Sequence, residues 1–240
     1  MNRRDVLKTT TAFITGTMMA SRSVRAQGGL DQDYNDYSGA LPNLALFGSN
    51  PALPSEEQEA KVILSKAPSA STIVDTALYF VSLPQINEKG EFYNAAWASQ
   101  WNPVIVAFYH HTNLASHYVL VMGDTIPWCA AFLNWCLEAN GFATTNSAGS
   151  GSFRTYGNSV QTPSIGDIVV FKSGDVDEAR VGRGHVGIFV DKTAEGLWIL
   201  GGNQKAGKHY SSVCISYFPS TMKKLVLHSF RRPVHSPTPT

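Results

Sequence analysis

The sequence is poor in charge and in cysteine, and it lacks the short motifs that usually mark a metal or cofactor site. Charged residues make up 15% of its 240 residues, and it has three cysteines. It contains no C-x-x-C, H-E-x-x-H, P-loop or G-x-S-x-G pattern. These absences argue against a metal site, a nucleotide site and a serine-hydrolase elbow. We therefore expect no metal and no cofactor.

One glycine pattern needs separate treatment. Residues 182–187 fit G-x-G-x-x-G, the fingerprint of a dinucleotide site. That fingerprint requires a strand before it and a helix after it, whereas a β-branched, strand-like stretch follows here. We therefore read the glycines as the edge of a strand and expect no dinucleotide.

The N-terminus has the features of an export signal. Arg3 and Arg4 precede an apolar pair and a lysine, and a weakly apolar stretch of small residues then runs to Ala26. This pattern is typical of a twin-arginine signal peptide over residues 1–26. The stretch is much shorter than the roughly 20 apolar residues that span a bilayer. The sequence therefore predicts a periplasmic or secreted protein without a membrane span.

Removal of residues 1–26 changes the charge balance. It takes away five of the 19 basic residues and one of the 18 acidic residues, which leaves 14 basic, 17 acidic and a net charge of −3. No strongly basic stretch is left, which argues against nucleic acid as a partner.

The chain can bury one core, because hydrophobic residues make up 43% of it. Helical patterns dominate the first half and strand patterns the second, which predicts an α+β fold. We expect the signal to be followed by a helical extension over 27–94, a main domain over 95–233 and a flexible tail over 234–240.

Periodicity and turn residues give the expected elements. A capping-box pattern starting at Ser55 opens the first helix. Helices are predicted over 55–66, 71–81, 94–101, 104–111 and 127–140. Strands are predicted over 167–172, 185–191, 196–200, 213–217 and 225–231.

The helix over 127–140 begins beside a cysteine. Pro127 suits the first turn, and Asp124 or Thr125 can cap it. Cys129 then lies at the positive end of the helix dipole, where the pKa of a thiol is lowered. The alternative is a small buried residue of a core helix, since free cysteine is among the most buried residue types.

The three cysteines cannot all pair within one chain. Cys129 is the best candidate to stay free, and a Cys136–Cys214 disulfide is an open alternative for the other two. Without that disulfide, Cys136 is expected to pack two turns deeper in the same helix.

A histidine and an asparagine have the spacing of a hairpin. His185 is flanked by Gly184 and Gly187, which allow another backbone or a substrate to approach closely. Asn203 follows 18 residues later, where the next strand ends. A hairpin can bring its carboxamide beside the imidazole, and a Cys–His pair needs such an orienting group. The alternatives are a structural histidine and a turn asparagine.

Four motifs in one order resemble the papain-like cell-wall hydrolases of the CHAP and NlpC type: PWCAAF at 127–132, PSIGDIVVF at 163–171, GHVG at 184–187 and LGGNQ at 200–204. The resemblance covers roughly residues 95–233. It implies a papain-like α+β fold with a C-terminal antiparallel sheet of about five strands. It also implies Cys129 as nucleophile, His185 as general base and then acid, and Asn203 as the orienting residue.

The resemblance further implies an exported cysteine hydrolase that cleaves an amide bond of peptidoglycan through a thioester. The enzyme would be an endopeptidase or an N-acetylmuramoyl-L-alanine amidase. Trp128, Gly184 and Gln204 are expected to contact the substrate, and Asp167 is expected to be structural. Two alternatives stay open, namely an inactive wall-binding module on the same fold and a cysteine acyltransferase or toxin.

Overall fold

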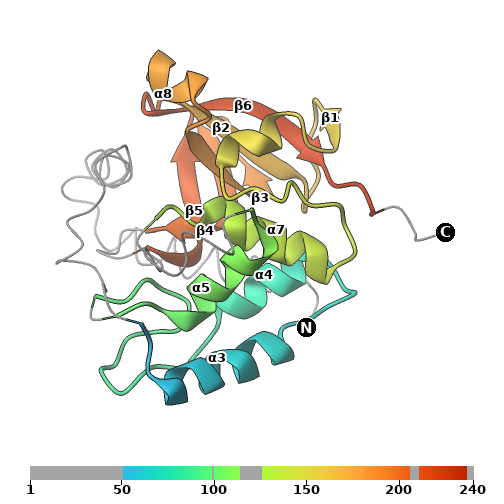
Figure 1. The fold of residues 1–240 in the computed structure, drawn as a ribbon. Helices are drawn as coiled ribbons and strands as arrows, with labels where there is room; N and C mark the ends of the chain where they lie inside the picture. Colours follow the sequence, from blue (N-terminus) through green and yellow to red (C-terminus); the bar gives the residue numbers. More distant parts are fainter. Residues whose placement is uncertain (1–50, 99, 114–125, 206–210, 237–240) are drawn as a thin grey trace.

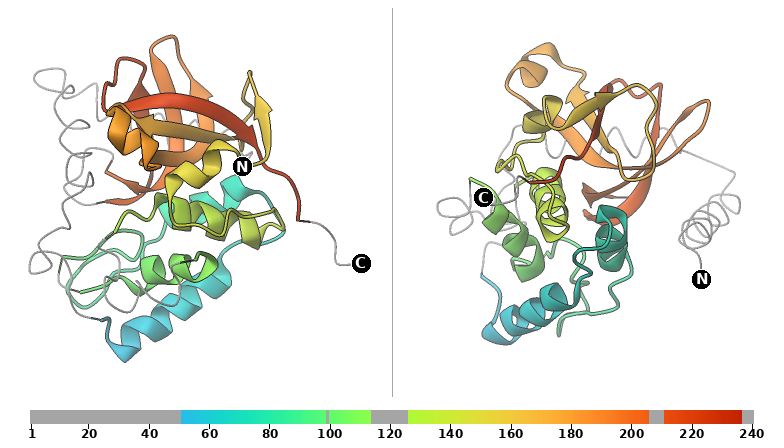
Figure 2. Two further views of the ribbon diagram at one scale, coloured as in Figure 1. Left: turned by 45° about the horizontal axis from the view of Figure 1, so that its top comes forward. Right: turned by 90° about the vertical axis from the view of Figure 1, so that its right-hand side faces the viewer.

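The computed structural model describes residues 51–98, 100–113, 126–205 and 211–236. Most of the helices pack beneath a curved antiparallel sheet, and the short helix over Val176–Arg180 lies above it, as Figure 1 shows, so the expected α+β architecture is confirmed. Figure 2 shows the same layering from two further sides. The predicted signal at 1–26 and the predicted caps Asp124 and Thr125 lie outside the described residues. No helix in the described part is long and apolar enough to cross a membrane.

Four of the five predicted helices are present in the described structure. Most of their ends lie within two residues of the predicted positions. The longer helices are α3 (Pro54–Lys66), α4 (Ile73–Val81), α5 (Pro103–Phe108), α7 (Cys129–Ala139) and α8 (Val176–Arg180). Two short 3-10 helices are η1 (Tyr109–His111) and η2 (Ser150–Arg154).

The first helix begins slightly earlier than the capping-box pattern predicts. Pro54 is its first residue and Leu53 its N-cap. The Glu56 carboxylate accepts a hydrogen bond of 2.8 Å from the backbone N–H of Leu53. The acidic half of the capping box is therefore present, but its N-cap lies two residues before Ser55, where Pro54 suits the first helical position because it has no N–H to satisfy.

The helix predicted over 94–101 is wrong. Ala95 forms an antiparallel bridge with Ser212 at the edge of the sheet. The side chain of Asn102 donates hydrogen bonds of 2.8 and 2.7 Å to the carbonyl oxygens of Tyr93 and Ala95. These carbonyls are thus satisfied without a helix, and the segment stays extended.

In the described part of the chain the sheet has six strands, one more than the five predicted. They are β1 (Asn158–Val160), β2 (Ile168–Ser173), β3 (Gly184–Lys192), β4 (Gly196–Gln204), β5 (Ser212–Pro219) and β6 (Leu225–Arg232). Their order is β1-β6-β2-β3-β4-β5. The strand missed by the sequence is β1, which has only three residues and is too short to show a period of two.

Each face of the sheet has its own apolar cluster. The face toward α7 joins strand residues such as Val186 and Ile188 to the helical core, which also holds Ile63 of α3 and Phe80 of α4. The described part of the predicted extension 27–94 therefore shares the core of the main domain, and the boundary at residue 95 stays a prediction. The opposite face holds a smaller cluster: Val169, Phe171, Phe189, Leu197, Ile199, Phe218, Leu225 and Phe230.

Glycine at position 202 lets β4 pack directly against α7. A Cβ there would lie 2.4 Å from Cζ3 of Trp128 and 2.9 Å from Cβ of Phe132. We expect Gly202→Ala to lower the free energy of unfolding by about 1–3 kcal/mol, because the packed helix and strand must move apart. Denaturant unfolding measures this change.

Gly149→Ala is the matched control. A Cβ there meets only the Ser147 hydroxyl, at 3.5 Å, which is an ordinary contact. Its stability should be unchanged or slightly raised. Equal stability of the two variants would contradict the close packing at Gly202.

Candidate active site

The α7 helix places Cys129 at its first residue. Trp128 is the N-cap, so the helix begins two residues later than predicted, and no described side chain caps it. Its apolar stripe is buried as predicted, from Cys129 and Phe132 to Leu137. The helix ends before Gly141, whose positive φ of 71° suits a left-handed cap.

The Cys129 thiol is buried, with 4% of the residue exposed. Burial raises its pKa to about 11, while the backbone N–H groups of Val186, Ala130 and Cys129 itself act to lower that pKa. The predicted net lowering by the helix terminus is therefore wrong, because desolvation of the thiolate outweighs the N–H groups. Val186 directly follows His185 on β3, so the thiol lies beside the strand that carries the histidine.

All three cysteines are free and buried. The alternative of a Cys136–Cys214 disulfide is therefore wrong. Cys136 is fully buried in the helical core, as expected for a packing residue.

His185 lies near the start of β3 under an aromatic ring. Only 7% of the residue is exposed. Its imidazole stacks on Phe218 of β5, with ring centroids 5.4 Å apart and an interplanar angle of 14°. Burial lowers the pKa of His185 to about 4, although the hydrogen bond with Gln204 acts to raise it. The imidazole is therefore neutral at pH 7.

Gln204, at the end of β4, holds the imidazole. Its Nε2 donates to the carbonyl oxygens of Cys214, Gly201 and Ile199 at 2.6, 3.2 and 3.3 Å. These oxygens can only accept, so the NH₂ group must face them and Oε1 must face the other way. Oε1 lies 3.1 Å from Nε2 of His185.

This contact sets the tautomer of the histidine. An amide oxygen only accepts, so Nε2 of His185 carries the hydrogen and donates it to Gln204. In a neutral imidazole the other nitrogen, Nδ1, then keeps its lone pair. A general base needs this arrangement, with one ring nitrogen held by an orienting group and the other free to take a proton.

Asn203, the predicted orienting residue, does not contact His185. It has a left-handed φ of 58°, and its buried Oδ1 has no partner. The pairing of β4 with β5 shifts register between Gly201 and Gln204. This irregularity turns Gln204 rather than Asn203 toward the imidazole, because one extra residue exchanges the faces to which successive side chains point. The antiparallel hairpin that the spacing predicted is confirmed.

The Cys129 thiol and the His185 imidazole lie on opposite faces of β3. Cys129 belongs to the helical core, whereas the Phe218 ring under His185 belongs to the opposite cluster. Pairing of β3 with β4 runs only from Lys192 to Ile188, so residues 184–187 pair with β2 alone among the described strands. Val186 lies in this stretch. No hydrogen bond joins the Cys129 and His185 side chains, both of which the structure describes.

Of the three residues predicted to contact substrate, Trp128 and Gln204 are buried and Gly184 is partly exposed. Trp128 is 1% exposed and packs near Phe108 and Phe132, so it forms no wall of a cleft. A Cβ on Gly184 would lie 2.0 Å from the carbonyl oxygen of Phe171. Gly184 therefore allows the β2 backbone to approach, which was one of the two expected uses of the glycine.

Asp167 has the structural role that was expected. Its two oxygens accept hydrogen bonds of 2.9 Å from Nε and Nη2 of Arg232, and one also accepts 2.7 Å from the backbone N–H of Ser164. It lines a pocket of about 510 Å³ that also involves Phe142. Phe142 follows the end of α7, whose last residue lies about 15 Å along the helix from Cys129, so this pocket is at the opposite end of the helix from the thiol.

The raised pKa of Cys129 predicts slow alkylation in the free protein. With iodoacetamide, the rate at Cys129 should be low at pH 7 and rise about tenfold per pH unit toward pH 11, because only the thiolate reacts. Mass spectrometry of the Cys129 peptide against pH measures this, with the Cys136 peptide as the buried comparison. A plateau already reached near pH 7 would contradict a neutral resting thiol.

Comparison with known proteins gives one finding. No curated protein and no solved structure matches the chain. Residues 121–203 match the family model of the CHAP domain. This segment includes Cys129, His185 and Asn203 and ends one residue before Gln204. The resemblance to the CHAP type is thereby confirmed over residues 121–203.

Proposed function

We propose that this protein is a cysteine hydrolase that cleaves an amide bond of peptidoglycan, with Cys129 as nucleophile and His185 as base. The CHAP match supports the substrate class, since CHAP domains are usually hydrolases of peptidoglycan amide bonds. The observation that carries the proposal is the Gln204–His185 hydrogen bond, which leaves Nδ1 as a base next to the backbone that contacts Cys129.

The reaction starts from an uncharged pair. As the Cys129 sulfur attacks the amide carbonyl, Nδ1 of His185 takes the thiol proton, and the imidazolium then protonates the leaving amine. Water hydrolyses the thioester, with the imidazole acting again as base. The backbone N–H of Cys129 has no partner within the helix, because it is the first residue of α7, and it can donate to the oxyanion.

The residues near the N-terminus support a site of action outside the cytoplasm. The adjacent arginines Arg3 and Arg4 and the weakly apolar stretch behind them support export by the twin-arginine route. Proteins that use this route fold before export, so the buried thiol would already be enclosed when it meets an oxidising compartment.

One observation favours a second candidate, a wall-binding module without catalysis. Cys129 and His185 are both buried and no hydrogen bond joins them, although each lies next to Val186. In this reading the CHAP-type fold binds the wall and the thiol is inert. Digestion of the wall distinguishes the two candidates.

Digestion of purified sacculi by the mature protein tests the proposal. The wild type should release fragments, and Cys129→Ala should lower the rate by about 10³-fold or more. Cys136→Ser is the matched control and should keep activity if the protein folds. Product masses separate an endopeptidase from an amidase. Activity retained in Cys129→Ala would refute the mechanism, and an inactive wild type that binds sacculi would favour the binding module.

Paired variants test which residue orients the base. Gln204→Leu removes the acceptor for His185 and should lower kcat by about 10–10³-fold, because the tautomer is no longer fixed. Asn203→Gly keeps the left-handed backbone at no steric cost and should lower kcat far less. The reverse order of the two effects would show that Asn203 orients the base. Circular dichroism confirms that both variants fold.

A further inference from the structure

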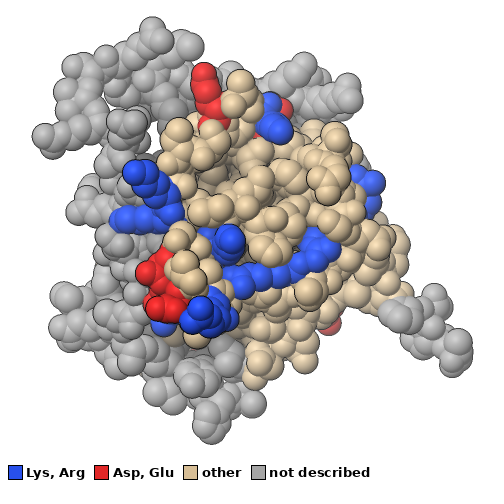
Figure 3. All heavy atoms as spheres, turned by 90° about the horizontal axis from the view of Figure 1, so that it is seen from above, with Lys and Arg blue, Asp and Glu red and all other residues tan. Residues whose placement is uncertain are grey.

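Four cationic or ionisable side chains converge beside the active site, and we call them the cation cluster: Arg154 of η2, Lys172 of β2, and His228 and Arg231 of β6. Arg231 donates to the carbonyl oxygen of Arg154, and Lys172 pairs with Val226, two residues before His228, so the three elements meet here. The charges of Arg154, Lys172 and Arg231 accordingly lower the pKa of His228. Figure 3 views the molecule from above, and Lys and Arg side chains cross the middle of that face.

No described carboxylate neutralises the cluster. Arg154 donates from Nη1 to the carbonyl oxygen of Ala179 at 2.7 Å and from Nη2 to that of Arg183 at 3.2 Å. Arg231 donates from Nη2 to the carbonyl oxygen of Arg154. These neutral acceptors fix the two guanidinium groups in place and leave their charge uncompensated.

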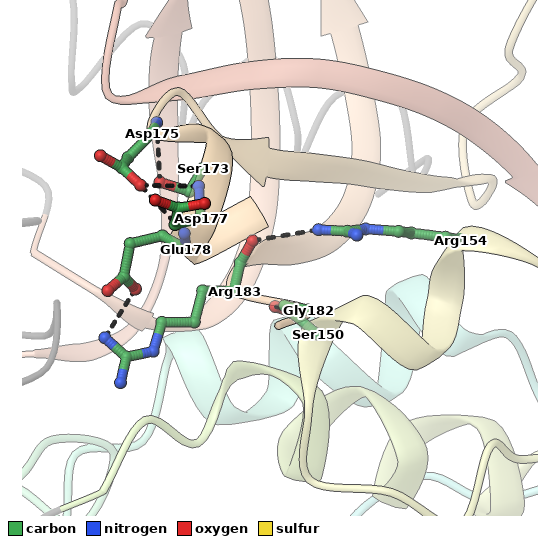
Figure 4. Close-up of polar contacts among 8 residues, drawn as sticks. All are labelled: Ser150, Arg154, Ser173, Asp175, Asp177, Glu178, Gly182 and Arg183. Carbon is green, nitrogen blue, oxygen red and sulfur yellow. Dashed lines mark hydrogen bonds and ion pairs between the residues drawn. The ribbon is translucent and has the colours of Figure 1, made fainter. Parts of the chain in front are cut away.

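The carboxylates near the cluster already bind other groups of the protein, as Figure 4 shows. Glu178 forms an ion pair of 2.6 Å with Arg183. Asp175 caps α8 by accepting from the N–H groups of Asp177 and Glu178. The positive charge of the cluster therefore faces no internal counter-ion in the described structure.

The two arginines also have unused donors. The Nε atoms of Arg154 and Arg231 are buried, and neither has a hydrogen-bond partner. Oxygen anions match guanidinium donors best.

A β-bulge presents the histidine of the cluster. Val170 pairs with Ser229 and Phe171 pairs with Leu227, so His228 is the extra residue of β6. Bulges re-aim a side chain and are common next to active sites. The His228 imidazole is exposed, and its Nδ1 lies 2.9 Å from the Ser229 hydroxyl.

The cluster lies at the same end of β3 as the base. The Arg183 carbonyl, which accepts from Arg154, is two residues before His185. The guanidinium of Arg154 is thereby anchored to the segment that leads into His185. Peptidoglycan peptides carry free carboxylates at regular intervals. A carboxylate is the counter-ion that the cluster lacks in the described structure.

We propose that Arg154, Lys172, His228 and Arg231 bind a carboxylate of the peptidoglycan peptide and hold the chain beside the active site. This inference rests on the proposed function and adds a subsite to it. The subsite acts in binding, so it can be measured without hydrolysis.

Binding to sacculi tests the subsite in the full mature protein carrying Cys129→Ala. The sacculi are stripped of attached phosphate polymers, and half of them have their carboxylates converted to amides. We expect the untreated sacculi to be bound on the order of tenfold more tightly than the amidated ones, with the difference shrinking as salt increases. Lys172→Glu should abolish the difference.

Lys192→Glu is the matched control, because Lys192 is an exposed lysine at the other end of β3, roughly 26 Å along the strand. It should keep the preference for untreated sacculi. Equal binding to both preparations, or equal effects of the two variants, would each overturn the carboxylate subsite. Because hydrolysis is not measured, failure of the subsite is distinct from failure of the Cys129 mechanism.

Discussion

The site depends on one polar contact, the carboxamide of Gln204 held between backbone carbonyls and an imidazole. Three carbonyl oxygens accept from the NH₂ group of Gln204, so the side-chain oxygen of Gln204 must face Nε2 of His185. The carbonyl of Cys214 belongs to β5, and those of Ile199 and Gly201 belong to β4 itself. The backbone geometry at the end of the sheet thereby determines which nitrogen of His185 carries the hydrogen.

Burial sets the charge state of the pair. A helix N-terminus and three backbone N–H groups favour a thiolate at Cys129, yet desolvation raises its pKa to about 11. Burial also lowers the pKa of His185 to about 4. Both groups are therefore neutral at rest. A buried, neutral thiol reacts slowly with thiol reagents.

The sequence predicted the elements better than the contacts between them. Periodicity located α7 and five of the six strands, because each of these elements is long enough to show a period. The spacing of His185 and Asn203 predicted a hairpin correctly. It could not show the register shift before Gln204, because a bulge depends on pairing with a neighbouring strand. The pKa of Cys129 was misjudged for a similar reason, since burial is a tertiary property. The cation cluster also comes from distant segments and leaves no local pattern.

The tautomer of His185 is the central claim, and nitrogen NMR of the labelled imidazole tests it most directly. At pH 7 the account predicts a neutral ring with the hydrogen on Nε2 and a bare Nδ1, and a change of state only near pH 4. A hydrogen on Nδ1, or an imidazolium persisting at pH 7, would contradict it.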